Sequence, residues 1–168
     1  MKLARPSTLL VGILAGQFML LSAPVALAAP ASAVVTPSGT SVSAAASSYG
    51  ESAFDATNQQ REKRDRRALG KNTCLRKYAV RQARKMANRQ DIWHQDLGKI
   101  LDDCRLSWVG ENVAAGFPSG RAVVNDGWMG SPDHRENLLA KKFRLMTVAA
   151  RKGDDGRWYA AQVFGKRA

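Results

Sequence analysis

An apolar pattern with helical spacing between residues 72 and 89 is the strongest constraint on how this chain can fold. Asn72 precedes the pattern and is a good N-terminal cap for a helix. Apolar and small residues then recur three or four positions apart, whereas the basic residues fall largely elsewhere on the helical wheel. The recurring residues are Leu75, Tyr78, Ala79, Gln82, Ala83 and Met86. We therefore expect an amphipathic helix with one face in the core and a basic face in water.

The C-terminal quarter of the chain has a different pattern. Segments 143–152 and 157–165 alternate in part between apolar and polar residues, and between them lies the turn signal Asp154-Asp155-Gly156. This arrangement predicts a β-hairpin. Since the helical patterns come first and the hairpin comes last, the fold class predicted for the chain is α+β.

Shorter elements are predicted between the long helix and the hairpin. Segment 56–70 is rich in helix formers, and Leu97, Ile100 and Leu101 indicate a short helix before Cys104. Segment 119–129 is predicted to be a helix capped by Ser119. A glycine at position 127 weakens that helix by about 1 kcal/mol relative to alanine.

The first 33 residues have the layout of a secretory signal peptide. Lys2 and Arg5 give a basic start, an apolar run spans residues 9–21, and small residues then offer cleavage sites after Ala28 or Ala33. The run is interrupted before it reaches the roughly 20 apolar residues of a membrane span. We therefore expect a secreted, extracellular product with no transmembrane segment after cleavage.

The segment that follows lacks the large apolar side chains that offset the entropy of ordering. Residues 34–53 are mostly Ala, Ser, Val, Thr, Pro and Gly, which predicts a disordered Ala/Ser-rich linker. The folded domain is then expected to span residues 54–168. A domain of this size is small enough to gain from a covalent cross-link.

The two cysteines are predicted to form that cross-link. Cys74 and Cys104 are an even pair in an exported chain, for which a disulfide is the default expectation. Closing the loop between them would stabilise the fold by roughly 3 to 4 kcal/mol. The alternative is a zinc site built from Cys74, His94 and Cys104, although no Cys-x-x-Cys spacing supports it.

The charge of the chain favours anionic partners. The formal net charge is +12 at pH 7, which is suited to an anionic cell-surface polymer or lipid. A solvated, soluble surface is the simpler explanation of the same charge. No aromatic-basic interleaving or zinc-finger spacing accompanies it, so no specific nucleic-acid partner is predicted.

Both histidines of the sequence lie in distinctive surroundings. His94 follows Trp93 beyond the end of the helical pattern and is expected in a loop. His134 is expected in the first turn of a helix that Ser131 caps and Pro132 begins. The positive end of a helix favours the neutral form of an imidazole there. Between the two histidines, Glu111 lies in an extended segment bounded by glycines.

Three motifs together resemble a known family. His94, the segment GENVAAG from Gly110 and the segment WMGSPDHRENLL from Trp128 are similar to the bacterial branch of the CAP superfamily. Its relatives include the cysteine-rich secretory proteins, antigen 5 and the plant pathogenesis-related 1 proteins. The resemblance covers about residues 58–165 and implies a three-layer α-β-α sandwich with a central cleft.

The same resemblance implies a set of site residues. His94, Glu111 and His134 would converge in the cleft and hold a divalent metal such as Zn²⁺, for which imidazole and carboxylate ligands with an open position are suitable. Asn112 and Ser131 would support these ligands, and Trp128 would be a packing residue. Ser131 stands where many eukaryotic members carry a second cleft glutamate, and the later histidine of their His-Tyr-Thr-Gln motif is absent from this chain. A hydrogen-bonded polar cluster that ties a loop to a helix remains the alternative.

Three functions are compatible with these residues. The leading hypothesis is a secreted binding module whose cleft holds a metal and a small or peptidic ligand at the cell envelope. The second is a metal-assisted hydrolase with Glu111 as general base, although no nucleophile beside a base is visible and no catalytic residue is predicted. The third is a basic secreted factor that binds anionic polymers through charge alone.

Overall fold

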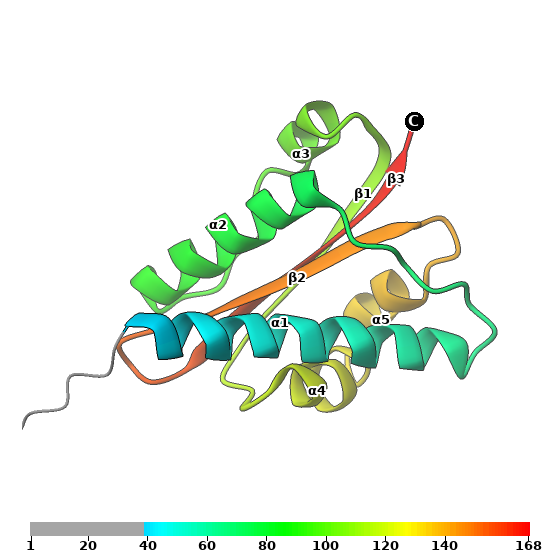
Figure 1. Cartoon of the computed structure of the whole chain (residues 1–168). Coiled ribbons are helices and arrows are strands. Elements are labelled where there is room, and N and C mark those ends of the chain that lie inside the picture. The colour runs from blue at the N-terminus through cyan, green and yellow to red at the C-terminus, as the bar shows by residue number, and fades with distance from the viewer. Residues whose placement is uncertain (1–38) are drawn as a thin grey trace, which may run out of the picture. The chain divides into compact units, whose positions relative to one another are not determined.

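The structure is a computed structural model, and it describes residues 39–168. The predicted signal peptide, residues 1–33, and the start of the predicted linker lie outside these residues. Helices cover both faces of one antiparallel sheet (Figure 1). The elements are, in chain order, α1 (Gly39–Glu62), α2 (Thr73–Arg89), α3 (Leu97–Asp103), β1 (Leu106–Ala115), α4 (Gly120–Ala122), the π-helix η1 (Val123–Trp128), α5 (Pro132–Leu139), β2 (Leu145–Lys152) and β3 (Trp158–Arg167).

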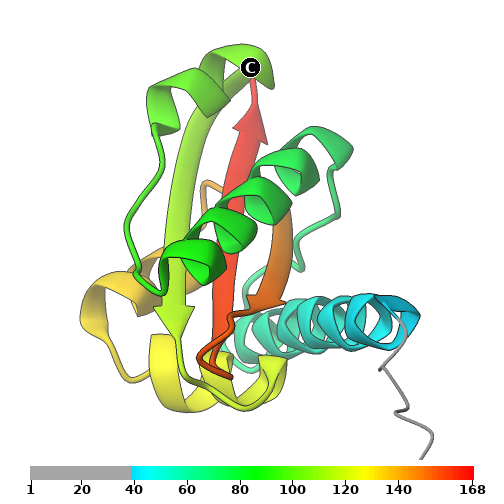
Figure 2. The ribbon, with the colours of Figure 1, turned by 90° about the vertical axis from the view of Figure 1, so that its left-hand side faces the viewer.

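The sheet has the strand order β1-β3-β2, with β3 antiparallel to both of its neighbours. Because β3 is central and covered on both faces, its residues from Tyr159 to Gly165 are all buried. One apolar cluster lies between the sheet and the helices α1, η1 and α5, and a second lies between the sheet and the helices α2 and α3. Figure 2 shows α2 lying across one face of the strands. The predicted α+β fold with three α-β-α layers is confirmed.

Helix α2 follows the sequence pattern closely. The Asn72 side chain accepts a hydrogen bond from the backbone N–H of Leu75 and thereby caps the helix. The buried residues of α2 are Leu75, Tyr78, Ala79, Gln82, Ala83, Met86 and Ala87. They comprise every residue expected in the core and one more alanine.

The disulfide between Cys74 and Cys104 is present. It joins the first turn of α2 to the residue that ends α3, directly before β1. The alternative zinc site with these two cysteines is thereby excluded, since neither thiolate is free.

The prediction of a disordered linker is wrong from Gly39 onward, because α1 begins there and continues to Glu62. Tyr49 and Ala53, both within the predicted linker, are buried in the core. The helix packs through small residues: a Cβ on Gly120, at the start of α4, would collide with the backbone of α1 at Tyr49 and Ala53. Close backbone contact substitutes here for the large apolar side chains that the segment lacks.

Segment 119–129 is helical as predicted, with the side chain of Ser119 accepting from the N–H of Ala122. The helix changes from α to π at Val123, and the N–H of Met129 bonds the carbonyl of Val124. Within residues 39–168 there is no helix long and apolar enough to span a membrane.

Candidate functional site at the free edge of β1

Strand β1 places two neighbouring polar residues on opposite faces of the sheet. Side chains alternate along a strand, so Glu111 points toward the segment after α2, and Asn112 points toward α1 and α5. β1 is an edge strand, and its free side faces α5. The two faces therefore meet around the edge of β1, and the predicted site residues gather there.

The carboxylate of Glu111 is fully buried and is held entirely by residues 94 and 95. His94 Nδ1 lies 2.9 Å from Glu111 Oε2. The backbone N–H of Gln95 donates to the same oxygen at 3.1 Å, and Gln95 Nε2 donates to Oε1 at 2.6 Å. A buried carboxylate needs such donors to offset the loss of hydration. The family resemblance grouped His94 with Glu111 but gave no role to Gln95.

The contact with Glu111 sets the tautomer of His94. A carboxylate can only accept hydrogen bonds, so Nδ1 carries the proton and Nε2 of the neutral ring keeps a lone pair. The His94 side chain is 56% exposed, in contrast to that of Glu111. The buried Glu111 carboxylate therefore orients the imidazole of His94, and Nε2 of the ring is available as a ligand.

His134 lies in the first turn of α5, and its imidazole is half-buried. Burial lowers the pKa of this imidazole, and the charge of His94 lowers it further, while Asp133 partly opposes both effects. The neutral form is therefore favoured, and the two histidines interact electrostatically. Among the described residues the His134 ring forms no hydrogen bond, whereas its backbone carbonyl accepts one from Asn112.

Asn112 is the centre of a buried polar network. Its Nδ2 donates to the His134 carbonyl at 3.1 Å and to Gln162 Oε1 at 3.1 Å. Its Oδ1 accepts from Asn137 Nδ2, which also lies 3.3 Å from the Glu111 carbonyl on the free edge of β1. Gln162 in turn donates to Thr57 on α1. The network joins α5, the sheet and α1, so it positions the helix that carries His134.

Trp128 and Ser131 take different roles from each other. Trp128 is buried, and its indole N–H donates to the carbonyl of Val113 at 3.2 Å. The side chain of Ser131 makes no capping hydrogen bond, which corrects the predicted cap of α5. Instead, the carbonyl of Ser131 accepts from the N–H of Arg135, as the first intrahelical bond requires.

The predicted three-ligand metal site is not assembled in the arrangement expected. No group of three or more His, Cys, Asp or Glu residues suited to a metal ion occurs within residues 39–168. Both oxygens of Glu111 are already occupied by protein donors. A cavity of about 370 Å³ adjoins His94, but its lining comes from α2 and residues 93–99 and includes neither Glu111 nor His134. Of the three predicted ligands, the two imidazoles keep a ring nitrogen without a hydrogen bond from the described residues.

Gln95 adds a feature that no sequence motif indicated. Its Oε1 is buried and has no hydrogen-bond partner among the described residues. Its amide nitrogen is committed to Glu111, so rotation of the amide would not relieve this. A buried acceptor without a protein partner needs a donor from outside the chain, such as water, an ion or a ligand group.

The comparison with family models agrees with this geometry. A model of the cysteine-rich secretory protein family, CAP, matches residues 54–164, which include His94, Glu111 and His134. The chain belongs to the CAP family. The match begins within α1, so this helix extends N-terminally beyond the matched residues. The match ends at Phe164.

Solved structures similar to this CAP domain come from bacteria. An outer surface protein of Borrelia burgdorferi is 26% identical, with a TM-score of 0.61, and the match covers 68% of this chain and 90% of that one. An extracellular Bacillus anthracis protein containing an SCP domain is 24% identical (TM-score 0.66), with 79% and 44% covered. A Staphylococcus aureus cysteine-rich secretory protein is 24% identical (TM-score 0.56), with 70% and 38% covered. The chain thus spans less than half of the last two proteins. The search of curated proteins gave no match.

Proposed function

We propose that this chain is a secreted or surface CAP-domain protein whose site at the edge of β1 binds a divalent metal, with Zn²⁺ as the first candidate. The observation that carries the proposal is the bond between His94 Nδ1 and Glu111 Oε2. A carboxylate that holds one nitrogen of a histidine commonly orients the other nitrogen toward a metal. In this scheme His94 and His134 are the ligands, and Glu111 positions His94.

The location outside the cell has three supports. The N-terminal 33 residues have the layout of a signal peptide. The similar structures include an outer surface protein and an extracellular protein. The disulfide between Cys74 and Cys104 is consistent with an oxidising compartment.

Two imidazoles leave most of the coordination sphere to other donors. Catalytic zinc sites usually have three protein ligands, so a two-histidine site binds more weakly and leaves positions for water or for a ligand group. When bound, the metal supplies a Lewis acid at the protein surface. The unsatisfied Gln95 Oε1 would accept from a donor on a small or peptidic ligand. We therefore favour joint binding of metal and ligand over a permanent structural metal.

Binding is favoured over hydrolysis by the state of Glu111. A general base must reach a proton of water or substrate, but the Glu111 side chain is 0% exposed. Its two oxygens receive three protein donors. The carboxylate is therefore placed to orient His94 rather than to accept a proton from a substrate.

Calorimetric titration of the mature protein with Zn²⁺ at pH 7.5 and pH 5.5 tests the proposal. Binding should release protons and fade at the lower pH, because imidazoles with a reference pKa of about 6.5 become protonated. His94→Ala and His134→Ala should each abolish measurable binding. Glu111→Gln should weaken it by roughly 10 to 100-fold.

Glu136→Gln is the matched control, since Glu136 is an exposed carboxylate on the same helix as His134. This variant should bind Zn²⁺ as the wild type does. A silent titration of the wild type, or equal binding by His94→Ala, would show that the His/Glu cluster is only a structural hydrogen-bonded tie.

A further inference from the structure

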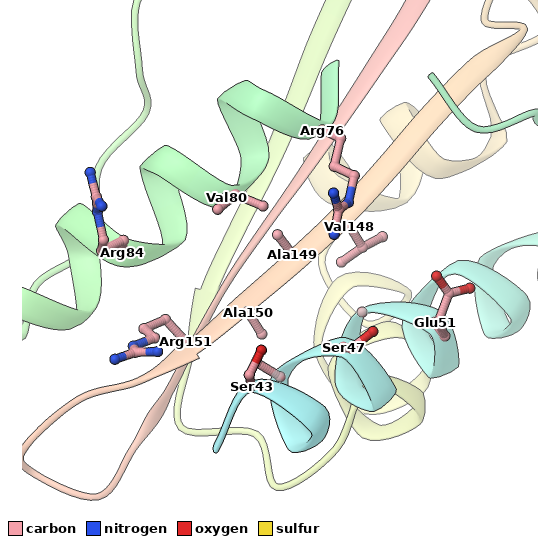
Figure 3. A pocket seen from close by; sticks show the side chains of 12 residues that line it. Ser43, Ser47, Glu51, Arg76, Val80, Arg84, Val148, Ala149, Ala150 and Arg151 are labelled. Carbon is pink, nitrogen blue, oxygen red and sulfur yellow. The ribbon is translucent and has the colours of Figure 1, made fainter. Parts of the chain in front are cut away.

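A second hollow lies at the opposite edge of the sheet, along β2. It has a volume of about 320 Å³ and is bounded by α1, α2 and residues 148–151 of β2. In Figure 3, Ser43, Ser47 and Glu51 on α1 lie on one side of β2, and residues of α2 lie on the other. We call this hollow the β2 groove. It contains neither histidine of the site at β1, so it is a separate surface.

Three arginines line the β2 groove: Arg76 and Arg84 on α2, and Arg151 on β2. All three are exposed, and their guanidinium groups have no ion pair, hydrogen bond or aromatic contact among the described residues. Glu51 is the acidic residue of the lining, and it already forms an ion pair with Lys71. The groove therefore carries three uncompensated positive charges.

Arg76 lies toward one end of the groove, and Arg84 and Arg151 lie toward the other end (Figure 3). Arg76, Val80 and Arg84 are spaced by four residues and share one face of α2. Arg76 and Arg84 are thus separated by about 12 Å along the helix axis, at 1.5 Å per residue. Arg151 lies near the end of β2, beyond Ala149 and Ala150 (Figure 3). Cations at both ends of a floor of small apolar residues match an extended ligand with repeated negative charges.

We propose that the β2 groove binds a linear polyanion with repeating phosphate groups. Guanidinium groups form paired hydrogen bonds with phosphate oxygens, and they keep their charge at any physiological pH. This inference names a partner for the basic surface and does not depend on metal binding at β1.

The lining argues against two other kinds of polyanion. No aromatic side chain lines the groove, so single-stranded nucleic acid would lack the stacking platform on which its bases usually rest. An acidic peptide would gain most by pairing with the edge of β2. That edge is obstructed at Val148, because α1 lies so close that a Cβ on Gly50 would be 2.8 Å from the Val148 carbonyl oxygen.

Binding of fluorescently labelled inorganic polyphosphate, measured by anisotropy at low salt, tests the proposal. The triple variant Arg76→Gln, Arg84→Gln, Arg151→Gln should lose about tenfold or more in affinity, because charge-assisted contacts are removed. The control Arg67→Gln, Arg105→Gln, Arg167→Gln removes the same charge from exposed positions outside the groove. It should lose less than about threefold, since distant exposed charges are screened. Equal losses would overturn the proposal in favour of diffuse attraction.

A second pair of variants tests the groove without changing the charge. Ser47→Trp places a large side chain in the lining of the groove, whereas Ser48→Trp places it on a neighbouring exposed position outside it. Only Ser47→Trp should weaken polyphosphate binding. If both variants bind as the wild type does, the groove is not the site.

Other probes identify the source of the phosphate. Polyphosphate should bind more tightly than poly-L-glutamate or oligo(dT) of equal charge, and tighter binding of either competitor would refute the assignment. Vesicles of phosphatidylglycerol that bind better than free polyphosphate would refute a linear polymer in favour of a lipid surface. His94→Ala should leave polyphosphate binding unchanged, so this proposal and the metal proposal fail independently.

Discussion

The two edges of the sheet are built in opposite ways. At the β1 edge, the polar groups of Glu111 and Asn112 are buried, and each of their side-chain oxygens and nitrogens contacts a protein partner. At the β2 edge, Arg76, Arg84 and Arg151 are exposed and unpaired among the described residues. Glu111 and Asn112 at the first edge belong to a buried hydrogen-bond network, and the second edge carries exposed, unpaired charges.

This difference has an energetic consequence. Removing one member of a buried network leaves its partners without hydrogen bonds, which costs about 1 to 3 kcal/mol for each unsatisfied group. Removing an exposed charge usually changes stability by less than about 0.5 kcal/mol. Substitutions of Asn112 and Glu111 should therefore lower stability, whereas substitutions of the groove arginines should leave stability nearly unchanged.

Asn112→Ala should produce the largest loss of stability, and it tests the contrast between the two edges most directly. It removes the partners of Gln162 Oε1, the His134 carbonyl and Asn137 Nδ2. We expect the free energy of unfolding to fall by about 3 kcal/mol, measured by urea denaturation. Arg84→Gln in the β2 groove should change it by less than about 0.5 kcal/mol. Similar losses in the two variants would contradict the division of roles.

Local sequence signals anticipated the elements that carry the residues of the β1 edge, but only the family resemblance implied that these residues gather. Glu111 was expected in an extended segment between glycines, His94 in a loop because the helical pattern had ended, and His134 in the first turn of a helix because of capping signals. The motifs did not indicate that both Glu111 oxygens accept hydrogen bonds from Gln95, because Gln95 is an ordinary loop residue in the sequence.

The β2 edge could not be anticipated because it depends on tertiary packing. The first half of α1 has few large apolar residues, so its composition indicated disorder, yet Tyr49, Gly50 and Ala53 pack it against the sheet and α4. The part of α1 that lines the groove was therefore predicted to be disordered, and the groove could not be expected. Its arginines come from α2 and from β2, and on a helical wheel Arg76 and Arg84 are indistinguishable from any solvated basic face.

Gly50→Ala should produce a moderate loss of stability, and it tests how tightly α1 packs against β2. Alanine favours a helix over glycine by about 1 kcal/mol, but its Cβ would meet the Val148 carbonyl at 2.8 Å. A backbone oxygen cannot rotate away, so α1 must shift. We expect a net loss of about 1 to 2 kcal/mol in urea denaturation. Ser48→Ala, an exposed position in the same helix, should instead be neutral or slightly stabilising. A stabilising Gly50→Ala would show that α1 is not held tightly against β2.

The smallest effect concerns the pH dependence of the metal-free protein. Burial and the neighbouring His94 lower the pKa of His134, whereas in the unfolded chain it should lie near about 6.5. Between the folded pKa and that value, the unfolded chain binds a proton that the folded chain does not. Stability must therefore rise with pH through this window, and this contribution is fully lost once the pH falls below the folded pKa. His134→Gln should remove this part of the dependence, measured by urea denaturation in EDTA at pH 5.0 and pH 7.5.

His94→Asn separates the two causes of the shift. With His94 gone, His134 is the remaining histidine of the chain, so its imidazole protons can be followed by NMR without overlap. Burial is the larger cause and persists, so the pKa of His134 should move up only part of the way toward the ordinary value. An unchanged pKa would mean that the two imidazoles do not interact across the β1 edge, and the two-histidine metal site would lose its geometric basis. A return to the ordinary value would mean that the charge of His94, rather than burial, dominates the shift.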